Sequence, residues 1–114
     1  MAIVFEKHHQ GRHYQVRSAG RSRRLYTDGV FHSQFNPAHV LTGSVWDLLF
    51  LPSQFYQPEE IKRVLVLGVG GGAVIHMLNR FMRPEQILGV ELSDWHIRLA
   101  RKFFDLRYDN LELV

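Results

Sequence analysis

The first third of the chain alternates apolar and polar residues in short runs separated by turn residues, a pattern typical of β-strands. These runs cover residues 2–5, 13–17, 24–27 and 30–35. The dipeptide Asp28-Gly29, between the last two runs, is a strong signal for a tight hairpin turn. We therefore predict that residues 1–35 form a small antiparallel sheet of three or four strands.

Residues 36–60 are predicted to form a linking helix and a loop. Asn36 and Pro37 suit the N-cap and the first position of a helix, which would run to about Leu51 and stop at Pro52. The apolar positions of this segment would share one broad helical face suited to burial: Val40, Leu41, Val45, Leu48, Leu49 and Leu51.

From residue 61 onward, short apolar strands alternate with amphipathic helices, as in a parallel α/β sheet. Strands are predicted at residues 64–67, 87–91 and 111–114, and helices at residues 73–83 and 94–104. The first of these strands is apolar on both faces, which is typical of a strand covered on both sides. The predicted fold class is α/β, with a small N-terminal antiparallel β sheet followed, over residues 61–114, by the first half of a Rossmann-like parallel sheet.

The predicted parallel sheet has no fourth strand, which in a doubly wound sheet pairs with the free edge of the first. The strand at residues 64–67 would then present an open apolar edge, which isolated proteins normally avoid. A partner, the N-terminal elements or further chain after Val114 could cover this edge. We favour the interpretation that the sequence is a fragment of a longer protein.

A glycine-rich turn follows the first parallel strand. Gly68, Gly70 and Gly72 stand at alternate positions there, and Glu91 ends the next strand 23 residues after Gly68. Glycines let the backbone approach a ligand, and a carboxylate about 20 residues further on is placed to accept ribose hydroxyls. The pattern predicts a nucleoside pocket. The alternatives are a tight turn with no ligand, a carboxylate that is merely exposed at a strand end, and a nicotinamide dinucleotide site.

The amino-acid composition excludes several other kinds of site and of protein. The chain is 46% apolar and has no cysteine, which excludes disulfides and thiolate metal sites. It has no apolar run of the roughly 20 residues that cross a bilayer, so we expect no membrane association and, by default, a cytoplasmic location. The net charge of +3 reflects a local excess of arginine, at Arg12, Arg17, Arg21, Arg23 and Arg24. We interpret these arginines as solvated surface, because no nucleic-acid-reading module accompanies them.

The seven histidines raise the question of a metal site. His8 and His9 are adjacent and would point to opposite faces of a strand, so they cannot share an ion. His76 and His96 fall on different predicted helices, without an acid at a spacing that matches known metal motifs. We therefore expect no metal site.

Several segments resemble the spermidine-synthase-like branch of the class I S-adenosylmethionine-dependent transferases. The resemblance covers roughly residues 23–114. The segments that carry it are the hairpin Leu25–His32, the dipeptide Leu51-Pro52, the glycine turn Leu67–Gly72, the strand end Val90–Asp94 and the helix Arg98–Phe104. Enzymes of this kind combine a small N-terminal β domain with a class I methyltransferase-like Rossmann domain and are commonly dimers, so the resemblance implies a homo-oligomer.

The resemblance also implies roles for individual residues. Gly68, Gly70 and Gly72 would surround the amino-acid portion of S-adenosylmethionine or its decarboxylated form. Glu91 would bind the ribose hydroxyls, and Leu92 would form a wall of the adenine site. His32 stands where the family's hairpin has glutamine, and it can still donate one hydrogen bond to the ligand.

The sequence also departs from the family pattern. Gly71 stands where the family usually has aspartate, and Asp47 is the sole acid of the segment 44–51, where the family normally binds a polyamine. The family's catalytic aspartate, the base that aminopropyl transfer requires, would lie beyond Val114.

Two hypotheses about function follow. The first is a transferase domain, of methyl- or aminopropyl-transferring type, that binds S-adenosylmethionine or its decarboxylated form weakly and does not turn over as this chain alone. The second is a non-catalytic interaction or regulatory module that retains the Rossmann-like fold.

Overall fold

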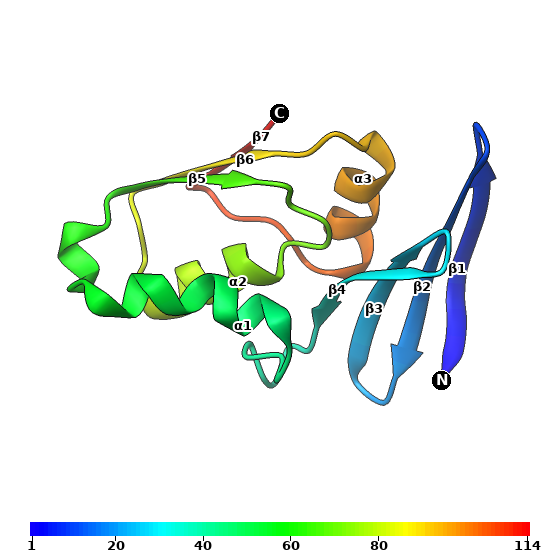
Figure 1. The fold of residues 1–114 in the computed structure, drawn as a ribbon, viewed down its shortest axis with the longest axis horizontal. Coiled ribbons are helices and arrows are strands. Elements are labelled where there is room, and N and C mark those ends of the chain that lie inside the picture. The colour runs from blue at the N-terminus through cyan, green and yellow to red at the C-terminus, as the bar shows by residue number, and fades with distance from the viewer.

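The computed structural model describes all residues from 1 to 114 and contains two separate sheets (Figure 1). The N-terminal sheet is antiparallel, with strand order β1-β2-β3-β4. Its strands are β1 (Ala2–His9), β2 (Arg12–Ala19), β3 (Ser22–Thr27) and β4 (Val30–Phe35). The first strand is longer than predicted because polar residues on its solvent side pair with β2 up to His9, which lies opposite Arg12. The predicted N-terminal antiparallel sheet is thus confirmed.

The second sheet is parallel and has the order β5-β6-β7. Its elements alternate as predicted: β5 (Arg63–Leu67), α2 (Ala73–Phe81), β6 (Gln86–Val90), α3 (Asp94–Phe103) and β7 (Leu111–Leu113). Buried side chains of α2, among them Ile75, Met77 and Leu78, join Ile87 of β6 in one apolar core. The α/β fold class with a partial Rossmann-like sheet is therefore confirmed.

Strand β5 is the edge strand of the parallel sheet and is covered on one face. Val64 and Val66 pack against the core, whereas 58% of Leu65 and 74% of Leu67 are exposed. The prediction that this strand is covered on both sides is wrong for this chain. In Figure 1, helices α1 and α2 both lie below the parallel sheet, and the opposite face carries no helix.

The linking helix is much shorter than predicted. Helix α1 spans Val45–Phe50, and a 3₁₀ helix, Leu51–Phe55, continues it through Pro52. Residues 36–44 are not helical, because Asn36 starts a turn in which its side chain accepts a hydrogen bond from the backbone N–H of Ala38 (2.9 Å). Asparagine side chains favour such turns over helix interiors. A second 3₁₀ helix, Pro58–Glu60, interrupts the predicted loop.

Helix α3 lies between the two sheets and connects them (Figure 1). Leu99 and Phe104, on and just after this helix, are buried with Tyr14, Val16 and Leu25 of the N-terminal sheet. The space beside this contact, where the N-terminal sheet faces the ends of β5 and β6, holds the predicted site. None of the helices has the length and apolar character needed to cross a membrane.

Candidate functional site

The glycine turn between β5 and α2 is pressed against the N-terminal sheet. Gly68 continues the strand ladder by donating its N–H to the carbonyl of Val90 (2.8 Å), and its α-carbon faces open space. Gly70 lies against β4, because a Cβ at this position would sit 3.3 Å from the carbonyl oxygen of His32. A Cβ at Gly70 would therefore require the hairpin to give way by a few tenths of an ångström.

Gly71 and Gly72 face packed interior rather than open space. A Cβ at Gly71 would lie 2.8 Å from the hydroxyl of Ser33 and 3.0 Å from Phe104, so this backbone has no room for the aspartate of the resembling family. A Cβ at Gly72 would lie 2.5 Å from Leu106, which follows α3. Gly72 thus lies in the interior, where it allows helix and sheet to pack closely.

Glu91 directly follows β6, and its carboxylate is directed at the glycine turn. Oε1 accepts hydrogen bonds from the backbone N–H groups of Val69 (3.1 Å) and Gly70 (2.8 Å), and Oε2 accepts one from Ser93 (2.8 Å). Burial alone would raise the pKa of Glu91, but these N–H donors and the adjacent His96 outweigh burial and lower the pKa to about 2. Glu91 is therefore a carboxylate at neutral pH.

His96, in the first turn of α3, joins this cluster although the sequence did not single it out as a site residue. Its Nδ1 lies 3.5 Å from Oε2 of Glu91, and its Nε2 shares a hydrogen bond of 2.7 Å with the hydroxyl of Thr27 on β3. One ring thus connects the parallel sheet to the N-terminal sheet. The available signal was its position three residues after the cap Ser93, which accepts its N–H (3.3 Å).

His32 projects from β4 toward the same cluster. Its ring centroid lies 5.1 Å from that of His96. Burial lowers the pKa of His32, and the neighbouring His96 lowers it further, so the ring is neutral at neutral pH. A neutral imidazole offers one donor and one acceptor.

Two open clefts meet at His32, Glu91 and His96. The first, of about 300 Å³, lies between the glycine turn and α1, and Gly68, Gly70 and Trp46 contribute to its lining. The second, of about 640 Å³, lies between the β1–β2 hairpin and the start of α3. Both volumes fall within the range of roughly 300–1,000 Å³ typical of small-molecule sites.

Leu92 borders the second cleft with its side chain fully exposed. The structure therefore brings five of the six predicted site residues to the two clefts and leaves Gly72 in the interior. Their roles toward a ligand stay predictions.

Asp47, the sole acid available for a polyamine on α1, is engaged locally. Oδ1 accepts hydrogen bonds from the backbone N–H (2.8 Å) and the hydroxyl (2.7 Å) of Thr42, and Oδ2 accepts one from the N–H of Gly43 (2.8 Å). Burial raises the pKa of Asp47, but these donors lower it more strongly, so that the net pKa is depressed. Asp47 thus holds the loop that precedes α1.

No protein-family model matches the chain, and no curated protein does. Solved structures of spermidine synthases do match its fold. A spermidine synthase from Thermotoga maritima matches 99% of this chain with a TM-score of 0.75 and 16% identity, and a probable spermidine synthase from Corynebacterium glutamicum matches 100% with 0.76 and 14%. A spermidine synthase in complex with the transition state analogue AdoDATO matches 99% with 0.75 and 16%.

At such low identity the likeness shows the fold alone. The chain spans 40% and 44% of the two named structures, and 39% of the one with the analogue. The chain therefore has a spermidine-synthase-like fold, of which it represents about two-fifths of the length.

Proposed function

We propose that this chain is part of a transferase that binds S-adenosylmethionine or its decarboxylated form, with the ribose held by Glu91. The observation that carries the proposal is the position of this carboxylate, which ends β6, faces the glycine turn and stands where two clefts meet. The depressed pKa of Glu91, about 2, keeps it ionised and able to accept hydroxyl donors.

The hydrogen-bonding capacity of Glu91 supports a single strong contact with the sugar. A carboxylate offers about four acceptor positions. Three of them are taken by the N–H groups of Val69, Gly70 and Ser93, and the remaining one on Oε2 lies beside His96. One ribose hydroxyl can donate to this position, and the neutral His32 ring can serve a second polar group.

The spermidine-synthase-like fold supports a nucleoside of this type, since one structure of that fold holds AdoDATO. The methyl group is the transferred group that we favour, because Thr42 and Gly43 already take three of the acceptor positions of Asp47, the sole acid of the segment 44–51, which leaves little capacity for the amines of a polyamine. Aminopropyl transfer, a dimeric assembly and a cytoplasmic location remain parts of the proposal to be tested on the whole protein. For this chain alone we propose weak binding and no turnover.

A second function is favoured by a different observation. The three hydrogen bonds that Glu91 accepts from backbone N–H groups give it a structural role even without a ligand. Gly71 is also enclosed by Ser33 and Phe104, which removes the family's acidic contact to the cofactor. Both features suit a non-catalytic module that retains the fold and uses it for interaction or regulation.

Titration calorimetry with S-adenosylmethionine and with methylthioadenosine separates the two functions. Leu92 is the informative position, because its side chain is fully exposed and a substitution there leaves the fold intact. We expect Leu92→Ser to weaken nucleoside binding severalfold. The matched control is Leu41→Ser, since Leu41 is also exposed and borders neither cleft, and it should bind like the original chain.

Glu91→Gln completes the test, because it keeps the shape of the side chain and removes its charge. A loss of affinity of roughly tenfold or more corresponds to the loss of one charged hydrogen bond. Absence of binding to both nucleosides by the original chain would contradict the transferase proposal and favour the interaction module. Turnover by this chain alone would contradict the proposed inactivity.

A further inference from the structure

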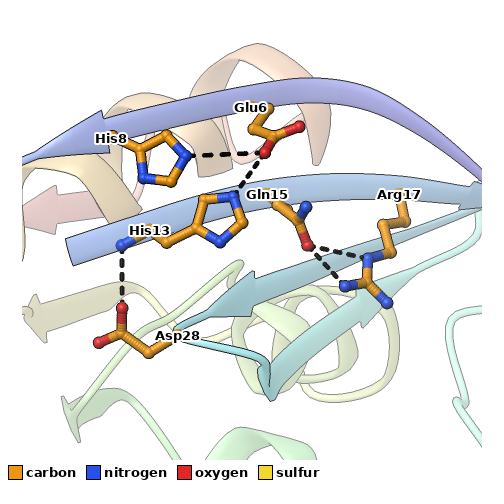
Figure 2. A network of polar contacts seen from close by, with 6 residues as sticks. All are labelled: Glu6, His8, His13, Gln15, Arg17 and Asp28. Atoms are coloured by element: carbon orange, nitrogen blue, oxygen red, sulfur yellow. Dashed lines mark hydrogen bonds and ion pairs between the residues drawn. The ribbon is translucent and has the colours of Figure 1, made fainter.

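The outer face of the N-terminal sheet carries a cluster that is independent of the clefts. Glu6 and His8 on β1 and His13 on β2 form this cluster, which we call the hairpin triad (Figure 2). His8 and His13 are directly paired across the two strands, so their side chains share one face. Glu6 lies two residues before His8 and points to that face as well.

The triad atoms are close enough to share one ion. Nε2 of His13 lies 2.7 Å from Oε1 of Glu6, and Nε2 of His8 lies 3.8 Å from the same oxygen. The potential ligand atoms of all three residues lie within 4.8 Å of one another. Zinc–ligand bonds of about 2.0–2.2 Å place tetrahedral ligands roughly 3.4 Å apart. The rings of His8 and His13 are stacked, with centroids 4.2 Å apart, and they would rotate out of parallel to direct one nitrogen each at a shared ion.

The backbone beneath the triad is held in place. The hairpin turns through Gln10 and Gly11, both with positive φ, and this two-residue turn fixes the register between His8 and His13. Asp28 binds the backbone of His13 on both sides: its Oδ1 accepts the N–H of His13 (2.9 Å), and its own N–H donates to the carbonyl (2.8 Å). The other oxygen of Asp28 pairs with Arg12 (2.9 Å), so the charge of this guanidinium is compensated.

The triad is also open to an entering ion. The side chains of His8, Glu6 and His13 are 74%, 44% and 31% exposed. Two imidazoles and one carboxylate are donors that suit zinc, nickel and copper, whereas magnesium and calcium prefer oxygen ligands throughout.

We propose that Glu6, His8 and His13 bind one divalent first-row transition-metal ion of the zinc type, with water completing its coordination. The ion bridges β1 and β2 and stiffens their hairpin. The same hairpin carries His9, Gln10 and Arg12, which border the second cleft from its other side. Metal binding on the outer face therefore orders one wall of that cleft.

Calorimetric titration of the chain, prepared without a histidine tag, with Zn²⁺ at neutral pH tests the proposal. We expect one ion per chain and a rise in Tm at saturation. Each of His8→Gln, His13→Gln and Glu6→Gln should weaken Zn²⁺ binding by roughly tenfold or more, because each removes one ligand.

Two histidines outside the triad serve as controls. His9→Gln alters the neighbour of His8 on the opposite face, where His9 lies beside Trp95, and His39→Gln alters another exposed histidine. Both variants should bind Zn²⁺ like the original chain. The proposal is overturned if the original chain binds no Zn²⁺, if Glu6→Gln or His8→Gln binds it unchanged, or if His9→Gln weakens binding as much as His8→Gln. His8→Gln is the decisive variant, because the side chain of His8 is largely exposed and its replacement should leave the fold intact.

Discussion

The carboxylate of Glu91 accepts hydrogen bonds from three backbone N–H groups in two segments of the chain. Its contribution to the stability of the folded state depends on pH. Its pKa in the folded chain is about 2, below the value of about 4.3 expected for an unfolded glutamate. A group whose pKa is depressed on folding stabilises the folded state above its unfolded pKa. That contribution is lost as the pH falls through the folded pKa.

We predict that Glu91→Gln lowers the free energy of unfolding by about 3 kcal/mol near neutral pH, from a pKa difference of roughly two units. The difference between the two proteins should shrink as the pH falls from about 4.5 toward 2, because the unfolded chain takes up a proton at Glu91 in this range, whereas the folded chain does so only near pH 2. Urea unfolding at a series of pH values measures this difference. A constant difference across that range would show that the charge of Glu91 does not hold the turn.

His76 on α2 is a second residue with a defined protonation state. Its Nε2 lies 2.7 Å from the carbonyl of Phe104, which can only accept, so this nitrogen carries the proton and Nδ1 accepts from the hydroxyl of Tyr108 (2.5 Å). Burial lowers the pKa of His76, and the bond to Phe104 offsets part of this effect. The ring is therefore neutral in the folded chain.

We predict that stability falls as the pH drops below about 6.5, where the unfolded histidine gains a proton that the buried ring does not accept. His76→Gln should lower the free energy of unfolding by about 1–3 kcal/mol, since it disturbs two buried hydrogen bonds. Glutamine does not titrate, so the variant should also lose less stability between neutral and mildly acidic pH. An unchanged pH dependence in urea unfolding would contradict the neutral, buried state of His76.

At the level of the elements, the glycine turn joins β5 to α2 through two positions with similar backbone and different surroundings. Gly68 and Gly72 have φ values of +83° and +88°, but a Cβ meets nothing at Gly68 and meets Leu106 at 2.5 Å at Gly72. The pair therefore separates the effect of backbone conformation from the effect of packing.

We predict that Gly68→Ala lowers the free energy of unfolding by about 1–2 kcal/mol, the cost of a left-handed conformation for alanine. Gly72→Ala should cost a further 1–3 kcal/mol or so, because the methyl group overlaps Leu106. Shortening that neighbour in the double variant Gly72→Ala, Leu106→Ala should cost less than the sum of the two single substitutions. Thermal and urea unfolding provide the measurements, and equal losses for both glycines would contradict the packing role of Gly72.

The sequence predicted the elements where local patterns and packing agree. The parallel unit followed from strand and helix periodicities and from the glycine turn, and each of its elements begins or ends within about two residues of its predicted bounds. The prediction of a helix from Asn36 failed because side chains compete there. Asn36 binds the N–H of Ala38 and Asp47 binds Thr42 and Gly43, so residues 36–44 form turns instead.

In the candidate site, too, the features set by local sequence could be predicted and those set by tertiary packing could not. Gly68, Gly70 and Glu91 could be predicted from spacing along the chain, and they lie together. The contacts of His96 with Thr27, and of His8 with His13, depend on packing between distant segments and on strand register. His9 is the neighbour of His8 in sequence, whereas strand register places His13 beside His8 on the same face of the sheet.

For the molecule as a whole, α3 makes the two sheets one folding unit. Leu99 is 1% exposed and packs with Tyr14, Val16 and Leu25 from the N-terminal sheet. We predict that Leu99→Ala lowers the free energy of unfolding by about 2–5 kcal/mol, as expected for a buried leucine. The matched control Leu48→Ala, at a position that is 65% exposed on α1, should change it by less than about 0.5 kcal/mol.

The same packing predicts a single cooperative transition for both sheets. Trp46 on α1 and Trp95 on α3 report on different parts of the molecule, because Trp46 packs against the core of the parallel unit and Trp95 packs against the buried cluster of the N-terminal sheet. Each of the variants Trp46→Phe and Trp95→Phe leaves a single tryptophan as the fluorescent probe. In each variant, the urea midpoint from fluorescence should therefore equal the urea midpoint from circular dichroism. Separate midpoints for the two probes would show that the sheets unfold independently.

The hydrogen bond between Thr27 and His96 has a consequence for ligand entry. It spans the boundary between the sheets at the point where both clefts begin, and His96 also contacts Glu91. A movement of one sheet away from the other would break this buried hydrogen bond of 2.7 Å and expose the apolar contacts around Leu99. The entrance to the clefts is therefore preformed, and a ligand that fits it loses little binding free energy to conformational rearrangement of the protein.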